Sequence, residues 1–351
     1  MARLKPIRTA VVGCGRIGAF TVKQPGDGLT ASYFPHNHCA AIRATPGLAL
    51  VAVCDTDAKA ARRAARLHHV RNVYADFRKM ILEQKPDILS IATRTAGRAD
   101  LIAFAAQHGV KGMHIEKPLA TNLRETRKAL DAIRKHSVAI SYGTVRRYMP
   151  VYRQAKAMLD SGRFGRLERI EIEFGKSNLL WTHPHSVDLM SYFSGNKPID
   201  YILSRFAFSR NDVRKNIVDC DPLLDYGHIR FKDGSGASIL PHDGQNIRAL
   251  CTNGEVAVYN NGESIMTRSK KSPLRKIRKK KGVSGRVQSF IELRDAIIKK
   301  EAPSLTPAEL LREQKMLLAL GYSGAHGRRK TKLSEINDAF TVTGKFNGLY
   351  P

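Results

Sequence analysis

A glycine motif directly after an apolar run limits what this chain can fold into. Residues 9–18 read Thr-Ala-Val-Val-Gly-Cys-Gly-Arg-Ile-Gly, which is typical of a buried strand, a tight turn and the start of a helix. Gly13 permits the sharp turn, Gly15 leaves space for a pyrophosphate beside the backbone, and Gly18 lets the helix pack closely on the strand. The helix N-terminus adds free N–H groups and the positive end of a dipole. The motif therefore predicts a dinucleotide-binding site.

A second apolar run, residues 48–54, predicts another buried strand, and Asp55 follows it directly. A carboxylate at this place accepts both hydroxyls of an adenosine ribose and repels a 2′-phosphate, so the sequence predicts NAD as the cofactor. Arg62 and Arg63 keep NADP open as an alternative. The simpler explanation of Asp55 is an ordinary surface carboxylate after a strand.

The bulk composition fits a two-domain enzyme. The chain has 351 residues, of which 42% are hydrophobic and 26% charged, and it contains no apolar run long enough to cross a bilayer. Its first residues lack the apolar core of a signal peptide. The five cysteines are scattered without a C-x-x-C pair, which predicts reduced thiols in a cytoplasmic protein and neither a disulfide framework nor a metal site.

The chain is strongly basic, with a formal net charge of +28. Such a surface attracts polyanions, among them nucleic acid, anionic lipid and phosphorylated metabolites, although a general basic bias explains it equally well. Residues 268–281 contain nine basic residues and no acid. We expect this run either to contact a substrate phosphate or to form a solvated loop between a sheet and the closing helices. It lacks the interleaved aromatic residues of a nucleic-acid-binding segment, so nucleic acid is not expected as a partner.

The pattern of the sequence changes near its middle. Strand and helix patterns alternate through residues 7–118, which predicts an α/β Rossmann fold with a doubly wound parallel sheet. Residues 167–174 alternate strictly between apolar and polar, and similar segments follow, which predicts an α+β region with a large, mostly antiparallel sheet. We therefore expect an NAD(P)-binding domain over residues 1–122 and a substrate-binding and oligomerisation domain over residues 123–351.

Residues 21–37 lengthen the connection between the glycine turn and the second strand. They contain two prolines and two glycines, and they place Asp55 well beyond the usual spacing of about 20 residues from a glycine motif. Tyr33 and Phe34 form an aromatic pair within this segment. We expect the segment to act as a lid over the cofactor or as a contact between subunits.

Glu116, Lys117 and Pro118 end another predicted strand, at the carboxyl edge of the parallel sheet. Ligands of open parallel sheets bind at that edge. A lysine there can donate to a substrate oxygen and move a proton with it. The plainer explanation is a Glu-Lys pair of the kind that commonly ends a strand.

Together these segments resemble the glucose–fructose oxidoreductase and inositol dehydrogenase (Gfo/Idh/MocA) family. The resemblance runs in the same order along nearly the whole chain. The matching segments are Gly13-Cys-Gly-Arg-Ile-Gly18, His38-Cys-Ala-Ala-Ile42, Val53-Cys-Asp55, Ile91-Ala-Thr93, Glu116-Lys-Pro-Leu-Ala120, Gly143-Thr-Val-Arg-Arg-Tyr148, Ser161-Gly-Arg-Phe-Gly-Arg-Leu167, Phe290-Ile-Glu-Leu-Arg-Asp-Ala-Ile297 and Gly327-Arg-Arg329.

The resemblance implies an NAD(P)-dependent dehydrogenase or reductase that transfers a hydride to or from a hydroxyl-bearing carbon of a sugar, nucleotide sugar or cyclitol. It implies that Lys117 orients the hydroxyl and that His185, aligned with the histidine of the family's Asp-x-x-x-His helix, acts as general acid and base. The residues implied to hold the cofactor are Gly13, Gly15, Arg16, Ile17, Gly18, Asp55, Thr93, Glu116 and Lys117. Those implied to bind the substrate are Arg147, Trp181, His183 and His185.

The chain departs from the family pattern at two places. Trp181 stands where the family has aspartate and His183 where it has glycine, so the site gains a stacking face and lacks a carboxylate. After Thr93, Arg94 stands in place of the family's proline, and Arg98 replaces a histidine. These departures bear on the substrate and the reaction direction, and they leave the dinucleotide motif intact.

Two other functions stay open at this stage. One is an NAD-dependent glycosidase of the same fold, which oxidises its substrate only transiently. The other is a non-enzymatic dinucleotide sensor, which Trp181 and the basic charge would suit, although Lys117 and His185 together argue against it. An exposed sheet face in the second half predicts a homodimer or homotetramer, and no membrane partner is expected.

Overall fold

The structure is a computed structural model that describes residues 5–22, 33–207 and 212–345. Internal contacts divide the chain into two compact units. Unit 1 comprises residues 1–120, 125–149 and 283–310, and unit 2 comprises residues 121–124, 150–282 and 311–351. The division expected at residue 122 follows chain order, whereas these units follow contacts, so segments from later in the chain belong to unit 1.

The sheet of unit 1 confirms the predicted doubly wound parallel fold. Among the described residues it has six strands in the order β3-β2-β1-β4-β5-β6, and every neighbouring pair runs parallel. The strands are β1 (Ile7–Val12), β2 (Leu48–Cys54), β3 (Asn72–Tyr74), β4 (Ile88–Ile91), β5 (Gly112–Ile115) and β6 (Ala139–Tyr142). The order reverses between β1 and β4, which marks the crevice where open sheets of this type bind ligands.

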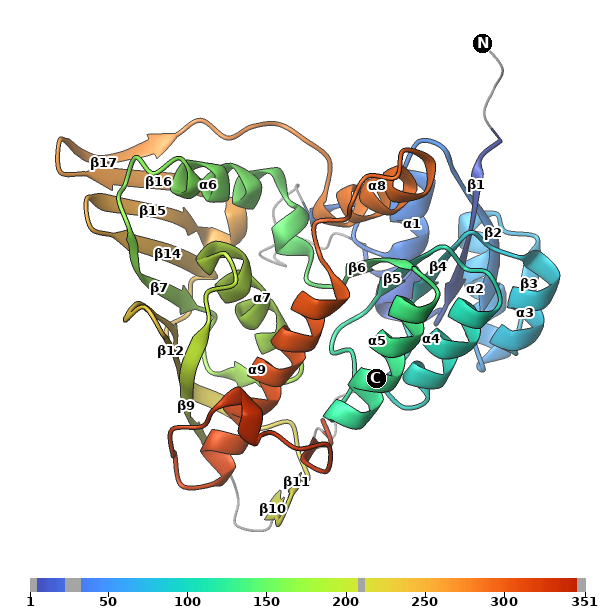
Figure 1. The fold of residues 1–351 in the computed structure, drawn as a ribbon. Coiled ribbons are helices and arrows are strands. Elements are labelled where there is room, and N and C mark those ends of the chain that lie inside the picture. Colours follow the sequence, from blue (N-terminus) through green and yellow to red (C-terminus); the bar gives the residue numbers. More distant parts are fainter. Residues whose placement is uncertain (1–4, 23–32, 208–211, 346–351) are drawn as a thin grey trace. The chain divides into compact units, whose positions relative to one another are not determined.

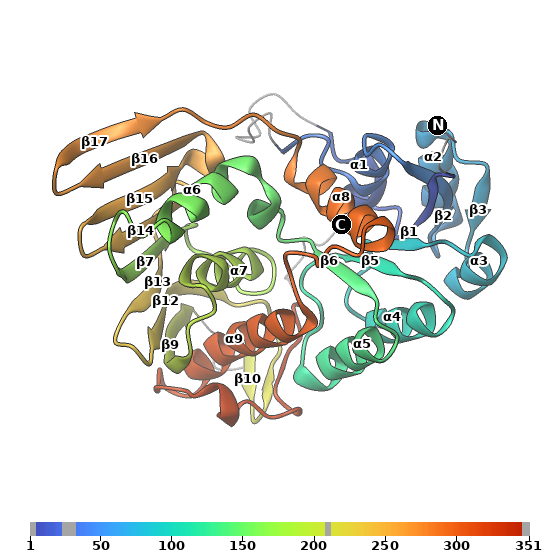
Figure 2. The ribbon, with the colours of Figure 1, turned by 45° about the horizontal axis from the view of Figure 1, so that its top comes forward.

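Helices cover both faces of this sheet (Figure 1, Figure 2). On one face, helices from both ends of the chain share a core with the strands, whereas two helices from the middle of the unit lie on the other face. The first set is α1 (His38–Arg43), α2 (Ala58–His68) and α8 (Gly285–Ile298), and the second is α4 (Arg98–Gln107) and α5 (Leu123–Lys135). α3 (Phe77–Gln84) links β3 to β4. Phe290 and Leu293 of α8 are completely buried in this core, which explains why a late segment of the chain completes unit 1.

The helix that follows the glycine turn is interrupted. η1 (Arg16–Phe20) makes a single π-type turn, and α1 begins only after the inserted segment. Asn37 caps α1, because its side-chain oxygen accepts from the Ala40 N–H at 2.8 Å, and its amide donates to the Thr21 carbonyl at 3.0 Å. The two ends of the insertion therefore meet, and the added residues explain the long spacing between the glycine motif and Asp55.

The expected lid or subunit contact falls mainly on residues 23–32, which lie outside the described residues. Tyr33, at the end of this segment, is 4% exposed, and the Arg146 guanidinium lies 5.8 Å from its ring centroid within unit 1. Such burial gives Tyr33 a packing role inside the unit and leaves little of its ring for another subunit.

Unit 2 contains the large, mostly antiparallel sheet that the sequence predicts. Its nine strands, counted among the described residues, follow the order β17-β16-β15-β14-β7-β13-β12-β8, and β9 pairs with β12. The β7–β13 pair runs parallel and the other described pairs of this sheet antiparallel. Its strands are β7 (Leu167–Glu173), β8 (Ser177–Asn178), β9 (Ile199–Ala207), β12 (Leu223–Phe231), β13 (Gly236–Leu240), β14 (Asn246–Cys251), β15 (Gly254–Tyr259), β16 (Ser264–Ser269) and β17 (Ser272–Ile277).

Helices α6 (Pro150–Asp160) and α7 (His183–Ser194) pack on this sheet, and α9 (Pro307–Ala325) follows in the closing part of the chain. A small sheet joins β10 (Val213–Arg214), β11 (Ile217–Val218) and β18 (Thr341–Val342). None of the helices among the described residues is both long and apolar enough to span a membrane.

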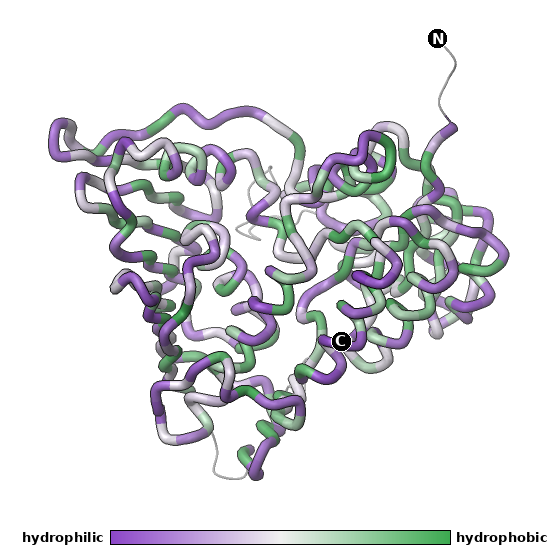
Figure 3. The backbone as a smooth tube through the Cα atoms, in the orientation of Figure 1, coloured by the Kyte–Doolittle hydropathy of each residue, from purple (hydrophilic) through white to green (hydrophobic). Residues whose placement is uncertain are grey.

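The basic run belongs to the large sheet. β16 and β17 form an antiparallel hairpin, and β17 is the edge strand. All nine basic side chains of residues 268–281 are exposed, and Figure 3 shows this hairpin as largely hydrophilic. The expectation of a solvated loop is therefore wrong for residues 272–277. Their side chains are solvated, but their backbone pairs with β16 as a strand.

The packing of α8 predicts that its apolar face stabilises unit 1. Phe290→Ala should lower the free energy of unfolding by about 3–5 kcal/mol, because Phe290 is fully buried among the strands and α1. Ile298→Ala is the matched control on the same helix, since Ile298 is 48% exposed, and its effect should stay within about 0.5 kcal/mol. Urea unfolding followed by circular dichroism measures both free energies. A loss for Phe290→Ala as small as that for Ile298→Ala would show that Phe290 does not stabilise the core.

Candidate active site

The glycine turn has the close contacts that its sequence predicts. Gly13 has a φ of 96°, and a Cβ on it would lie 2.6 Å from the carbonyl carbon of Ala92, at the end of β4. A Cβ on Gly18 would lie 1.9 Å from the Gly13 carbonyl oxygen. Both positions therefore require glycine: the first for its left-handed backbone and for its contact with the neighbouring strand, the second for the contact between η1 and the turn.

Gly15 differs from these two glycines because, among the described residues, no atom beyond its chain neighbours lies within 4 Å of the place where its Cβ would be. Asp55 lies beside this open space, and its carboxylate accepts the N–H groups of Cys14 at 2.6 Å and Asp57 at 2.9 Å. A pyrophosphate fits the open backbone at Gly15, and an adenosine ribose fits the carboxylate next to it. The structure thus brings together the predicted cofactor residues of β1 and β2.

The other predicted cofactor residues lie around this turn. Arg16 is exposed and Ile17 partly buried in η1. The hydroxyl oxygen of Thr93 is buried without a hydrogen-bond partner among the described residues. Buried polar groups are normally hydrogen-bonded, so this hydroxyl is available to a bound ligand. Of the two arginines that keep NADP open, Arg63 stacks on Phe20, with its guanidinium 4.5 Å from the ring centroid.

Arg98 connects the two loops at this edge of the sheet. It is 2% exposed and donates to the Glu116 carbonyl at 2.5 Å and to the carbonyls of Thr93 and Pro118. Burial lowers the pKa of Arg98 to about 10, which leaves it charged at neutral pH. The sequence identifies Arg98 only as a departure from a family histidine, because nothing in the pattern shows which carbonyls it reaches.

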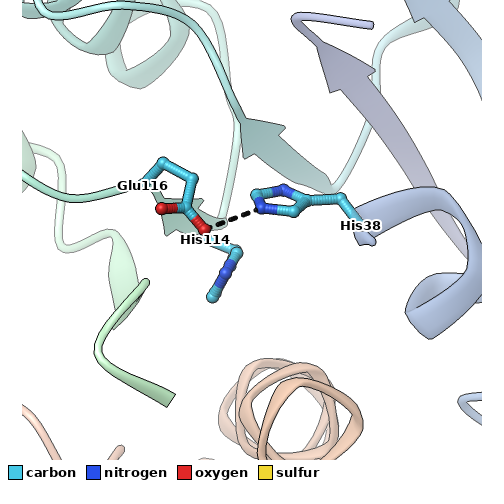
Figure 4. A group of neighbouring side chains, drawn as sticks. All are labelled: His38, His114 and Glu116. Atoms are coloured by element: carbon cyan, nitrogen blue, oxygen red, sulfur yellow. Dashed lines mark hydrogen bonds and ion pairs between the residues drawn. The ribbon is translucent and has the colours of Figure 1, made fainter. Parts of the chain in front are cut away.

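Lys117 follows a carboxylate that is held from several sides. Glu116 is 5% exposed, and it forms an ion pair with Arg286 at 2.8 Å. Its carboxylate is also hydrogen-bonded to His38 at 3.1 Å, as Figure 4 shows. Burial alone would raise the pKa of the Glu116 carboxyl, but the Arg286 charge and the His38 hydrogen bond hold it well below its usual range. Lys117 itself is half-buried, and its N–H donates to Glu116 Oε2 at 3.1 Å.

Two neighbouring histidines stay neutral beside this ion pair. Burial, with the Arg286 charge as the next cause, lowers the pKa of His38 to about 4 and that of His114 well below its ordinary value. Sequence reasoning missed Arg286 and His114 as site residues. A usable signal was present, because Ser90, His114 and Ser141 interrupt three otherwise apolar strands.

In unit 2 the predicted substrate residues have different environments. Trp181 is 53% exposed at the turn before α7, and its backbone N–H donates to the buried carboxylate of Asp221 at 3.1 Å. His185 is half-buried in the first turn of α7. His183 is completely buried, its Nδ1 lies 3.0 Å from the Ser186 hydroxyl, and burial lowers its pKa to about 3. A substrate can therefore reach the ring of Trp181, whereas His183 is enclosed by the protein.

Arg147, the fourth predicted substrate residue, belongs to unit 1. It is 2% exposed, and its Nη1 donates to the Ser304 carbonyl at 3.2 Å. This contact gives Arg147 a structural role between residues 145–148 and the segment after α8.

Known proteins share this architecture. Residues 7–144 match the model of the oxidoreductase family with an NAD-binding Rossmann fold (GFO_IDH_MocA). The uncharacterized oxidoreductase YrbE of Bacillus subtilis (strain 168) is 29% identical over 274 residues, which cover 73% of this chain and 74% of that protein. The scyllo-inositol 2-dehydrogenase (NAD(+)) of the same organism is 29% identical over 270 residues, which cover 72% and 73%. The crystal structure of the aldose-aldose oxidoreductase from Caulobacter crescentus has the same fold, with a TM-score of 0.77, 14% identity and coverage of 93% and 99%.

The family model spans the strands from β1 to β6, and the glycine turn, Asp55 and the Glu-Lys pair lie on strand ends within that span. Residues 7–144, which form this parallel sheet, therefore match the model of an oxidoreductase family with an NAD-binding Rossmann fold (GFO_IDH_MocA).

Proposed function

We propose that the chain is an NAD-dependent dehydrogenase or reductase of a hydroxyl-bearing carbon in a sugar, nucleotide sugar or cyclitol. The observation that carries this proposal is that the open backbone at Gly15, the carboxylate of Asp55 and the half-buried Lys117 all follow the carboxyl ends of strands of one parallel sheet. The relative named scyllo-inositol 2-dehydrogenase (NAD(+)), which aligns with most of the chain, supports a cyclitol or sugar as the substrate.

The chain's own residues have separate tasks in this reaction. When NAD is bound, its nicotinamide accepts or gives the hydride. Lys117 donates to the substrate oxygen and moves its proton, and His185 acts as general acid and base, since an imidazole exchanges a proton near neutral pH. Trp181 offers its exposed ring as a stacking face for the substrate.

NAD is the favoured dinucleotide because Asp55 would repel a 2′-phosphate. Its carboxylate lies at the glycine turn, where the adenosine ribose is expected. Arg63, which could otherwise pair with a 2′-phosphate, is stacked on Phe20. The basic surface of the chain favours substrates that carry a phosphate, as a nucleotide sugar does.

The open cradle gives a first test. Gly15→Val should leave the thermal stability nearly unchanged, because no atom of the described residues beyond its chain neighbours lies within 4 Å of the new Cβ, and it should weaken NAD binding at least about tenfold, which is ~1.4 kcal/mol. Gly18→Val is the contrasting variant, since its Cβ would overlap the Gly13 carbonyl and lower the stability itself. Titration of NADH fluorescence and a thermal melt measure the two effects. Unchanged NADH binding in a folded Gly15→Val protein would refute the cradle.

The role of Asp55 is tested by the choice between NAD and NADP. Asp55→Ala should weaken NAD about ten- to a hundredfold through loss of charge-assisted hydrogen bonds, and it should weaken NADP much less. Asp55→Asn is the comparison variant, because its amide oxygen can still accept the Cys14 N–H, although it loses the charge and the acceptor for the Asp57 N–H. The ratio of the two dissociation constants is the measurement, and an unchanged ratio in both variants would remove Asp55 from the ribose site.

The proposed activity is tested by a screen of inositols, sugars and nucleotide sugars for a change in NADH absorbance. Lys117→Ala and His185→Ala should each reduce kcat about a hundredfold or more on the substrate found, with NAD affinity largely kept. His183→Ala serves as a comparison in unit 2, since that ring is enclosed. A substrate that is cleaved without net NADH formation would instead establish the glycosidase alternative, and wild-type turnover in the Lys117 and His185 variants would place the chemistry elsewhere.

A further inference from the structure

A row of polar side chains crosses the sheet of unit 1 where apolar ones are expected. Ser90 of β4, His114 of β5 and Ser141 of β6 are neighbours in register, and each is at most 1% exposed. A parallel sheet covered on both faces is normally filled with apolar side chains, so such a row needs hydrogen-bond partners. α1 brings His38 to this row and α8 brings Arg286.

The guanidinium of Arg286 lies among one carboxylate oxygen and two ring nitrogens. Its Nη1 is 2.8 Å from Glu116 Oε1, 2.6 Å from His114 Nε2 and 2.9 Å from His38 Nε2. These three residues, drawn in Figure 4, have ligand atoms within 4.8 Å of one another. Two histidines and one carboxylate form a set that suits Zn²⁺, but here a guanidinium nitrogen stands where the ion would lie.

The protons of this cluster can be assigned with both histidines neutral. Nη1 of Arg286 has two protons, and it donates them to His114 Nε2 and Glu116 Oε1. His38 then donates its Nε2 proton to the same carboxylate oxygen at 3.1 Å and accepts from the Ser90 hydroxyl at 2.6 Å. The Nδ1 of His114 donates to a serine hydroxyl of β6 at 2.8 Å. One cation therefore pairs with the carboxylate and with His114, and both neutral histidines keep hydrogen-bond partners. The Nε of Arg286 has no hydrogen-bond partner among the described residues.

The same cluster reaches the peptide that carries Lys117. Glu116 Oε2 accepts the Lys117 N–H at 3.1 Å, and a Cβ on Gly143 would lie only 2.7 Å from that oxygen. We propose that Arg286 is a positioning residue: it supplies the fixed cation of the His38, His114 and Glu116 group, and through Glu116 it fixes the Lys117 peptide. The effect on catalysis rests on the function proposed above for Lys117, whereas the identity of the cation does not.

Replacing Arg286 tests whether its guanidinium is the cation that the His38, His114 and Glu116 group binds. Arg286→Ala leaves two imidazoles and a carboxylate around vacated space, so we expect it to bind Co²⁺ with tetrahedral absorption bands and to gain Tm as Zn²⁺ is added. The wild-type chain should show neither effect. Arg98→Ala is the matched control, because Arg98 is equally buried in unit 1 and its hydrogen bonds among the described residues go to carbonyl oxygens. The double variant Arg286→Ala/His114→Ala should also fail to bind Co²⁺.

Turnover provides the second readout. Arg286→Ala should lower kcat about ten- to a hundredfold, as expected for a misplaced catalytic group, while the Kd for NAD stays within about twofold. Arg286→Lys and the addition of Zn²⁺ to Arg286→Ala should each restore part of kcat. A merely structural role would reduce the amount of folded protein without separating kcat from NAD affinity and without recovery by the metal.

Several outcomes would overturn the proposal. Wild-type protein that binds Co²⁺ as tightly as Arg286→Ala, or a folded Arg286→Ala that binds none, would show that Arg286 is not the resident cation. An unchanged kcat in the metal-free variant would remove its positioning role. A variant that refolds only with Zn²⁺ supports the proposal, and one that does not fold even with Zn²⁺ is replaced by Arg286→Ser and judged by the same criteria. Because the Co²⁺ and Tm readouts need no turnover, an inactive wild-type chain would refute only the proposed function.

Discussion

The backbone at Gly13 lies against the backbone at Ala92, and this contact determines the shape of the ligand-facing edge of unit 1. β1 and β4 can end side by side only because Gly13 has no side chain to occupy the space between them. The turn is therefore compact where the strand order reverses. Asp55, at the end of β2, and Thr93, after β4, reach it from the strands on either side. A larger residue at Gly13 would push the ends of β1 and β4 apart at this turn.

Unit 1 contains two buried guanidinium groups, those of Arg98 and Arg286, and they bind different kinds of acceptor. Arg286 balances a carboxylate, whereas Arg98 donates to the backbone carbonyls of the loops after β4 and β5. The histidine that the sequence resemblance implies at this position has two ring nitrogens and a shorter reach, so it could not donate to all three carbonyls at once. Arg98 therefore connects two loops at the edge where Lys117 lies, and it keeps a positive charge beside them.

Local patterns predicted much of this fold. The apolar runs of β1 and β2 indicate strands buried on both faces, and the alternation of β7 indicates a strand with one exposed face. The interruption between η1 and α1 could not be predicted in detail, since it depends on Asn37 meeting the Thr21 carbonyl across an insertion. The glycines of the turn were identifiable from the sequence, because at Gly13 and Gly18 a side chain would overlap neighbouring backbone atoms. Arg286 was not, because its partners come from β5 and α1, far earlier in the chain, and long-range contacts leave no local period.

The predicted roles of unit 2 residues illustrate the same limit. An alignment places Trp181 and His183 two residues apart, but the turn before α7 exposes the first and the helix buries the second. Exposure depends on which face of a helix meets the sheet, and a motif does not contain that information. Packing thus leaves Trp181 accessible to a ligand and encloses His183 in the first turn of α7.

The open edge at β17 has a consequence for how copies of this chain meet in solution. An exposed edge strand offers backbone N–H and C=O groups to any strand that approaches, and lysines along the edge discourage such pairing. Two molecules aligned edge to edge would bring two rows of positive charge within a Debye length, which is about 8 Å at physiological ionic strength. Electrostatic repulsion therefore opposes extension of the sheet from one molecule into the next. That protection weakens as salt is added, so the colloidal stability of the chain should depend on ionic strength more than its fold does.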